Sequence, residues 1–403
     1  MEENTDRDKG KLRLITTASG PAEILLDFNA SPSNKRVGKG LSRKSVVTVN
    51  MEAIDTSMDY KLSGKFGYDL LVNIDSSRDV PDMSCNKIEE NFTSLKELCE
   101  GSHSNIFKVD YQARKDSQTP KDIIKGIVKQ MKKTSVGNKI AACEFEREKQ
   151  FLTKLVHPNI VVMYSFGVAK ALNCPFLVLE RLDGGTLSSF LSSRRPFNCR
   201  PFGYMELLKA AIDFCSALKY LHHGLPNQIC IIHRDLKPDN LAFTSTGTLK
   251  IIDFGLCVSI KKTDNLNDIY ELTGSTGSLR YMAHEVALNA HYNEKVDIYS
   301  FGVILYEMVT GVTPFKGFGK AKFMSEVIEK HYRPPTDFDD YLRKIRVSKE
   351  IINIIELSWN YDYKRRPTAN TIFEILSEEL EKHKKFRSTF WGRINDSLFS
   401  RNY

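Results

Sequence analysis

The sequence lacks the features of a secreted, membrane-spanning or disulfide-stabilised protein. Its longest apolar stretch, around Phe301–Val309, contains Glu307 and is far too short to cross a membrane as a helix. The first residues are too charged for a secretory signal, and Glu2 excludes N-myristoylation. The eight cysteines are scattered, with no C-x-x-C pair and no histidines at zinc-binding spacing. We therefore expect reduced thiols and a soluble protein of the cytoplasm or the nucleus, with no membrane span.

A strong charge bias is also absent, except in one short segment. The net charge is +8 over 403 residues, and residues 383–403 alone hold five basic side chains and one acidic side chain. Nucleic-acid binding requires a dense basic face with aromatic platforms, of which this tail, with Phe390 and Trp391, has only a trace. We expect a basic and aromatic C-terminal tail at 383–403 that is solvated or docks, and no nucleic-acid partner.

The N-terminal quarter of the chain has little hydrophobic patterning. Residues 1–90 contain 15 Ser and Thr, four aromatic residues and no Trp. This composition predicts a polar, flexible extension. Two β-rich stretches, at 45–49 and 68–74, leave partial folding open.

From Phe92 the pattern changes to that of a folded domain. Short strand-like runs and one long amphipathic stretch, Ala141–Val156, occupy about 91–180, and after Tyr204 the pattern is mainly helical. These features predict an α+β fold with a small β-rich lobe at about 91–180 and a larger α-helical lobe at about 183–382.

Two short motifs lie at a fixed distance in the second lobe. Residues 233–240 read His-Arg-Asp-Leu-Lys-Pro-Asp-Asn, and Asp253 begins an Asp-Phe-Gly triplet thirteen residues after Asn240. The joint pattern resembles the catalytic loop and the metal-binding motif of eukaryotic protein kinases. The resemblance covers about residues 92–382 and implies the two-lobed kinase fold. It implies that Asp235 accepts or orients the proton of the substrate hydroxyl, and that Asn240 and Asp253 hold Mg²⁺.

The same resemblance implies a site for the phosphates of ATP. Lys129 follows a strand-like run, and its family counterpart reaches the α- and β-phosphates and pairs with a glutamate of the next helix. By the family's spacing, the resemblance implies that this glutamate is Glu148. Alternatively, Lys129 and Glu148 are ordinary surface charges. The nearby competitors for their roles are Lys132, Lys133, Glu144 and Glu146.

The glycine-rich loop of the family is degenerate in this chain. Its pattern aligns with Cys99, Gly101, Ser104 and Ile106, so that one of three glycines remains. Glycine permits positive φ and a close approach of the backbone to phosphates, so Cys99 and Ser104 are expected to stiffen and crowd the loop. Ile106 can still cover the adenine.

Around the adenine, the sizes of two residues are exchanged relative to the family pattern. Ile127 stands where a small residue is common, and Ala242 stands where a larger aliphatic residue is common. The exchange either conserves volume or is unrelated drift. The resemblance assigns the linker between the lobes to Glu180 through Leu182, with backbone groups that bind adenine, and Leu179 to the entrance of the deeper pocket.

The substrate side of the site follows from the same alignment. Lys237 matches the Ser/Thr-kinase form of the catalytic loop and can neutralise charge on the transferred phosphoryl group. Ser278 takes the position that contacts the catalytic aspartate, and Arg234 is of the kind that pairs with a phosphate on the activation segment. The candidate phosphorylation sites, which could equally be ordinary polar residues of a loop, are Thr273, Ser275 and Thr276.

The sequence leads us to expect an ATP- and Mg²⁺-dependent protein Ser/Thr kinase that resembles the tyrosine-kinase-like group. Its partners would be protein substrates and either an upstream kinase or a second copy that autophosphorylates. A pseudokinase scaffold is the main alternative, because the loop is degenerate and Ala283-His284-Glu285 replaces the usual Ala-Pro-Glu. A lipid or small-molecule kinase is disfavoured by the peptide-docking elements at 278–285.

Overall fold

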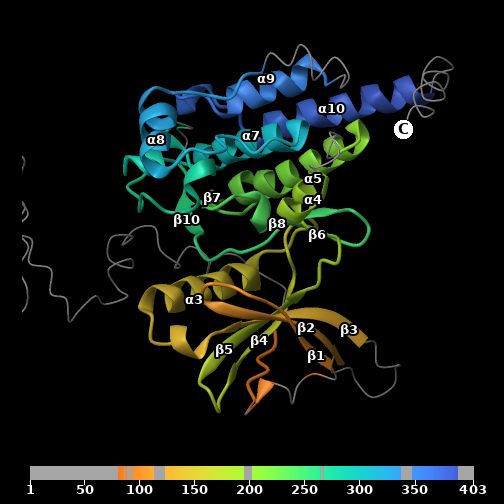
Figure 1. The fold of residues 1–403 in the computed structure, drawn as a ribbon, viewed down its shortest axis with the longest axis vertical. Coiled ribbons are helices and arrows are strands. Elements are labelled where there is room, and N and C mark those ends of the chain that lie inside the picture. The colour runs from red at the N-terminus through yellow and green to blue at the C-terminus, as the bar shows by residue number, and fades with distance from the viewer. Residues whose placement is uncertain are drawn as a thin grey trace, which may run out of the picture. The chain divides into compact units, whose positions relative to one another are not determined.

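The computed structural model describes residues 80–85, 87–88, 92, 94–112, 123–194, 202–263, 265, 267–336 and 347–388. The β-rich stretches at 45–49 and 68–74, and the aromatic residues 390 and 391, lie outside this part of the chain. The described residues form a small lobe built on a β-sheet and a larger helical lobe (Figure 1). The expected two-lobed α+β fold is confirmed.

The small lobe is a five-stranded antiparallel sheet in the order β1-β2-β3-β5-β4. Its strands are β1 (Ser94–Glu100), β2 (Ser104–Gln112), β3 (Ile123–Met131), β4 (Met163–Ala169) and β5 (Cys174–Glu180). Burial alternates along β4, as expected for a strand with one face on the core. The central strands place Lys129 of β3 opposite Leu177 of β5, so this lysine has little freedom to shift along the sheet.

A short 3₁₀ helix, η3 (Lys133–Ser135), leads from β3 into helix α3 (Lys139–Lys154). The side chain of Asn138 caps α3 by accepting hydrogen bonds from the amides of Ile140 and Ala141. Helical spacing puts Ala141, Phe145 and Glu148 on the buried face. The sequence thus turns Glu148 toward the sheet that carries Lys129.

Residues 80–85 run along the outer edge of β4, and we call them the edge segment. The segment pairs with β4 in parallel through hydrogen bonds between Met83 and Phe166 (2.7 Å) and between Cys85 and Val168 (3.1 Å). A Cβ on Gly167 of β4 would lie 2.8 Å from the backbone of the segment. Glycine is therefore required for this close approach, and part of the N-terminal extension is built into the small lobe.

The large lobe is helical around a single buried core. Its helices are α4 (Leu187–Arg194), α5 (Tyr204–His223), α6 (His284–Ala287), α7 (Lys295–Thr310), α8 (Lys320–Phe323), the π-helix η7 (Met324–Glu329), α9 (Lys349–Ser358) and α10 (Ala369–Ser388). Every residue of α7 is buried, and the helix ends at Gly311 with φ 67°. Within the described residues, no helix is long and apolar enough to cross a membrane.

Short strands and 3₁₀ turns of the large lobe flank the chemical motifs. They are β6 (Gly185–Thr186), β7 (Ile229–Ile232), β8 (Leu241–Phe243), β9 (Leu249–Ile251) and β10 (Val258–Lys261), with the 3₁₀ turns η5 (Pro238–Asn240), η6 (Leu279–Tyr281) and η8 (Tyr363–Arg365). β7 ends immediately before His233, and β9 ends two residues before Asp253. The pairing of β8 with β9 therefore holds the two motifs side by side.

Candidate active site

One end of the cleft between the lobes contains a partly buried charge cluster, in which Glu148 is fully buried. Lys129 Nζ lies 2.6 Å from Glu148 Oε2 and 3.4 Å from Asp253 Oδ1. Burial lowers the pKa of Lys129, but Asp253 and Glu148 outweigh it and hold that pKa above its ordinary value. Lys129 lowers the pKa of Asp253, whereas burial raises the pKa of Glu148. Lys129 is thus a fixed cation beside an ionised Asp253, and Lys132 pairs instead with Glu100 at 2.7 Å.

The carboxylate of Asp235 is held by four hydrogen-bond donors. Oδ1 accepts from the amide and the hydroxyl of Ser278, both at 2.9 Å. Oδ2 accepts from Lys237 Nζ at 2.6 Å and from Asn240 Nδ2 at 3.0 Å. Gly277 reaches φ 94° next to this carboxylate, and a Cβ there would overlap the carbonyl oxygen of Arg234.

The backbone that carries Asp235 is strained, and a side chain of α7 stabilises it. Arg234 has φ 68°, in the left-handed region that L-residues seldom adopt. Asp297 of α7 is 1% exposed and accepts hydrogen bonds from the amides of His233 (2.8 Å) and Arg234 (3.0 Å). His222 Nε2 lies 3.0 Å from the same carboxylate. The helix thereby fixes the loop that carries the candidate catalytic group.

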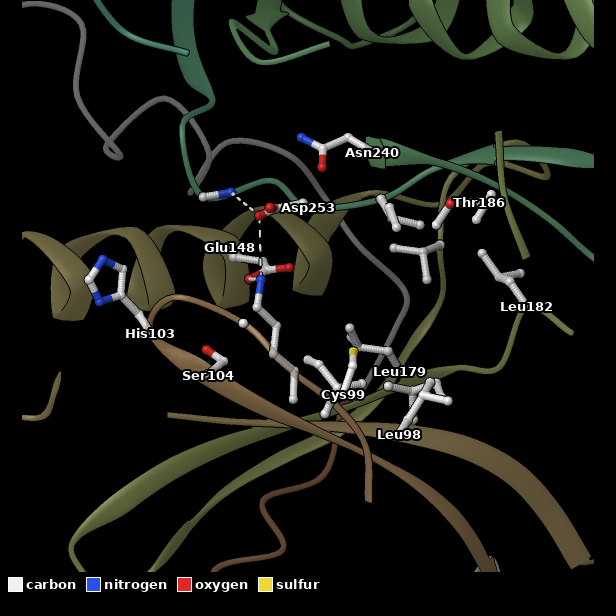
Figure 2. Close-up of a pocket in the computed structure, with 18 of the residues that line it drawn as sticks. Leu98, Cys99, His103, Ser104, Glu148, Leu179, Leu182, Thr186, Asn240 and Asp253 are labelled. Atoms are coloured by element: carbon white, nitrogen blue, oxygen red, sulfur yellow. Dashed lines mark hydrogen bonds and ion pairs between the residues drawn. The ribbon is translucent and has the colours of Figure 1, made fainter. Parts of the chain in front are cut away.

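Apolar side chains line the other end of the cleft. The whole cleft has a volume of about 650 Å³. Ile106, Ile127, Leu179, Leu182 and Ala242 all contribute to this lining. Figure 2 shows Leu179 and Leu182 at this end, well separated from Asn240 and Asp253. The cleft is of the size and character of a small-molecule site.

The linker offers fewer free backbone groups than expected. The amide of Glu180 donates to the carbonyl of Val162 at 2.7 Å, and its side chain binds Lys250 Nζ at 2.6 Å. Arg181 and Leu182, the other two linker residues, both line the cleft. Leu98, Asp183, Thr186 and Glu144 also line the cleft. Glu144 was expected only as an alternative to Glu148, and it shares the same helix face because it lies four residues earlier. The motifs did not point to the other three residues.

The loop between β1 and β2 has an ordinary backbone at the degenerate positions. In the described part of the chain, neither Cys99, Gly101 nor Ser104 has positive φ. Cys99 and Ser104 therefore do not stand at positions where the backbone conformation itself requires glycine. Gly101 remains where a Cβ would lie 3.2 Å from the carbonyl oxygen of Ser104. The one retained glycine occupies the crowded position of the turn.

The activation segment brings a single candidate phosphorylation site to Arg234. The guanidinium of Arg234 donates to the hydroxyl of Thr273 at 2.7 Å. The hydroxyl of Ser275 bonds to Asn289, and the hydroxyl of Thr276 to the carbonyl of Thr273.

The end of the segment is fixed to the large lobe despite the missing proline. Arg366 is fully buried against Glu285, at 2.5 and 3.0 Å. His284 fills the proline position, stacks on Tyr361 with 3.9 Å between ring centroids, and lies 3.0 Å from Glu285. The ion pair between Glu285 and Arg366 is therefore kept, although a histidine stands where the family has a proline.

Comparison with known proteins agrees with this geometry. The model of the protein kinase domain matches residues 92–376. Serine/threonine-protein kinase VIK of Arabidopsis thaliana is 36% identical over 244 residues, covering 60% of this chain and 51% of the relative. Two other Arabidopsis thaliana relatives are 29% identical: serine/threonine/tyrosine-protein kinase HT1, with 58% of this chain and 54% of the relative covered, and serine/threonine-protein kinase STY46, with 63% and 41%.

The match thus spans about half the length of these curated relatives. Their names agree with the resemblance to Ser/Thr kinases drawn from the motifs. The family model covers well over half of the chain, and its matched range contains every residue of the site described above. The chain belongs to the protein kinase family.

Proposed function

We propose that the protein is an ATP- and Mg²⁺-dependent kinase that phosphorylates Ser and Thr hydroxyls of protein substrates, with residues 91–382 as its kinase domain. The supporting observation is that one cleft is lined by Lys129, Glu148 and Asp253 together with Asp235 and Asn240. A phosphate-binding cation, a metal-binding pair and a candidate base are therefore within one site. Phosphoryl transfer requires this combination and little else from the protein.

Each group has a role that its contacts support. Lys129, held by Glu148, orients the phosphates and offsets their charge. Asp235 accepts the proton of the incoming hydroxyl, and Ser278 and Asn240 fix its orientation. Lys237 lies close enough to Asp235 to neutralise charge on the group in transfer.

The residues present suit a hard divalent cation. Asn240 commits its Nδ2 to Asp235, which leaves Oδ1 as the oxygen available to a cation. The lowered pKa of Asp253 keeps that carboxylate ionised. Oxygen ligands of this kind are those that Mg²⁺ prefers. Bound there, Mg²⁺ supplies charge neutralisation at the phosphates.

A nucleotide-binding scaffold without activity is the competing function. Its support was the degenerate loop and the lost proline of the activation segment. The loop has no positive φ at Cys99 or Ser104, and His284 keeps the clamp between Glu285 and Arg366. Neither departure removes a group that phosphoryl transfer requires, so the active kinase is favoured.

The adenine end and the regulatory end complete the proposal. We assign adenine to the slot formed by Ile127, Leu179 and Ala242, with Leu182 as its backbone donor. We assign regulatory phosphorylation to Thr273, by an upstream kinase or in trans by a second copy, because Arg234 already contacts its hydroxyl. The cysteines of the described part are free thiols, which favours a reducing compartment such as the cytoplasm.

The test is transfer of labelled phosphate to a peptide library that varies the acceptor among Ser, Thr and Tyr. We expect transfer to Ser and Thr peptides by the wild type, and none by Asp235→Asn, which should still bind ATP because its carboxylate faces the acceptor. Glu350→Gln, at an exposed surface carboxylate, is the control. Unchanged turnover in Asp235→Asn would refute the assignment of the base, and binding without transfer by the wild type would favour the scaffold.

A further inference from the structure

The loop between β1 and β2 is attached by its side chains to the segment that follows β3. Glu100 Oε1 lies 2.7 Å from Lys132 Nζ, and His103 Nδ1 lies 3.3 Å from the hydroxyl of Ser135. Ser135 is 6% exposed, so it offers a fixed partner rather than a mobile one. Lys132 lowers the pKa of Glu100, as expected for a carboxylate held beside a cation.

Backbone hydrogen bonds place the side chains of Glu100 and His103 next to the residues that follow β3. The amide of Lys132 donates to the carbonyl of His103 at 2.9 Å, which continues the pairing of β2 with β3. The amide of Gly101 donates to the carbonyl of Ser104 at 2.8 Å and closes the turn between them. Glu100 and His103 thus flank a tight turn, and each reaches a different residue beyond β3.

The residues that hold the loop are connected to the helix that carries Glu148 of the charge cluster. Ser135 ends η3, and its carbonyl accepts a hydrogen bond from Asn138, the residue that caps α3. Figure 2 shows His103 beside α3, while Leu98 and Cys99 lie toward Leu179. The loop, the strand of Lys129 and the helix of Glu148 are therefore joined at one point.

We propose that Glu100, Lys132, His103 and Ser135 form a clasp that holds the loop closed over the phosphates, in place of the two missing glycines. They are positioning residues for the nucleotide, and the proposal rests on the proposed function of the cleft. A glycine-rich loop must lose conformational freedom when it closes on a ligand. A loop already fastened to the segment between β3 and α3 has less freedom to lose, so binding retains affinity without the glycines.

The variants Lys132→Met and Ser135→Ala each open one half of the clasp and leave the backbone pairing intact. Lys133→Met is the matched control, because Lys133 is an exposed lysine of the same turn. Two measurements apply to the full-length chain. Amide hydrogen exchange of residues 99–104 is followed without nucleotide, and affinity for a fluorescent ADP is measured at equilibrium.

We expect faster exchange of the loop amides in both variants, and a loss of ADP affinity of about two- to fivefold in each, the range of a partly exposed polar pair. Because the two halves hold the same loop, the double variant should lose more than the product of the single losses. The KM for ATP should rise in parallel, with little change in kcat or in the KM for peptide.

Unchanged exchange and affinity in the double variant would overturn the clasp, and so would equal effects in Lys133→Met. A loss of melting temperature that accounts for the whole effect would do the same, because it would indicate a purely structural role. The outcome is separable from the proposed function. If the wild type transfers no phosphate, exchange and ADP affinity still decide whether the clasp exists.

Discussion

The substitution Asp297→Asn tests how α7 supports the catalytic loop. The carboxylate accepts hydrogen bonds from two buried amides, of His233 and Arg234, and lies 3.0 Å from His222 Nε2. Asparagine keeps the volume but places an NH₂ group against at least one of these donors. A hydrogen bond to a charged group contributes roughly 1.5–3 kcal/mol, and breaking a buried charged contact costs about 3–5 kcal/mol. We therefore expect the free energy of unfolding to fall by about 3–5 kcal/mol.

Urea unfolding measures this loss, and steady-state kinetics measure its effect on turnover. The strained φ of Arg234 should relax without its acceptor, so kcat should fall while equilibrium ADP affinity changes little, because Lys129 and the apolar slot are on other elements. Glu374→Gln, at an exposed position of α10, controls for loss of a carboxylate. A stability loss below about 1 kcal/mol, the level of a neutral hydrogen bond, would refute the reasoning.

Three further predictions follow from other parts of the structure. Burial raises the pKa of Glu285, but the guanidinium of Arg366 and the imidazole of His284 outweigh burial and lower that pKa from 4.5 to about 2. The contribution of Glu285 to the stability of the fold should therefore be complete above pH 4.5 and disappear as the pH falls toward 2. Unfolding free energies of the wild type and Glu285→Gln should therefore converge only in that acid range. Ile127→Ala should lower ATP affinity by roughly 1–3 kcal/mol, and Ala242→Leu should block the adenine slot. The variant with both changes should recover most of the lost affinity. Additive effects would show that residues 127 and 242 do not both contact the adenine. Gly167→Ala should destabilise the fold by about 1–3 kcal/mol through overlap with the edge segment, and Gly137→Ala, with open space around its Cβ, should not.

The fold was predictable to the extent that it depends on local patterns. The helical spacing of Ala141, Phe145 and Glu148 shows in the sequence, and so do the motifs that the family resemblance rests on. The edge segment was not predictable. Its residues mix apolar and polar side chains without a strand period, and their pairing with β4 depends on Gly167, which lies more than eighty residues away in the sequence. Pairing between segments so far apart in the sequence produces no hydrophobic pattern that would reveal it in the sequence of either segment.

The site shows the same division. Lys129, Glu148, Asp235, Asn240 and Asp253 were expected from spacing and resemblance, and the structure brings them into one cleft. Sequence reasoning could not find which backbone groups are already occupied, as in the linker, or which activation-segment hydroxyl meets an arginine. Those facts depend on how chain segments cross in space.

The degenerate loop shows why a departure from a family pattern is weak evidence about function. A glycine matters where φ is positive or where a Cβ would clash, and at positions 99 and 104 the structure requires neither. Glycine at those positions would add freedom to the unbound loop, so restoring it should weaken ATP binding rather than tighten it. A double variant, Cys99→Gly with Ser104→Gly, with a lower KM for ATP than the wild type would contradict this argument. Gly101→Ala, by contrast, should loosen the turn that the clasp holds, because its Cβ would lie 3.2 Å from the carbonyl oxygen of Ser104 and push that oxygen away.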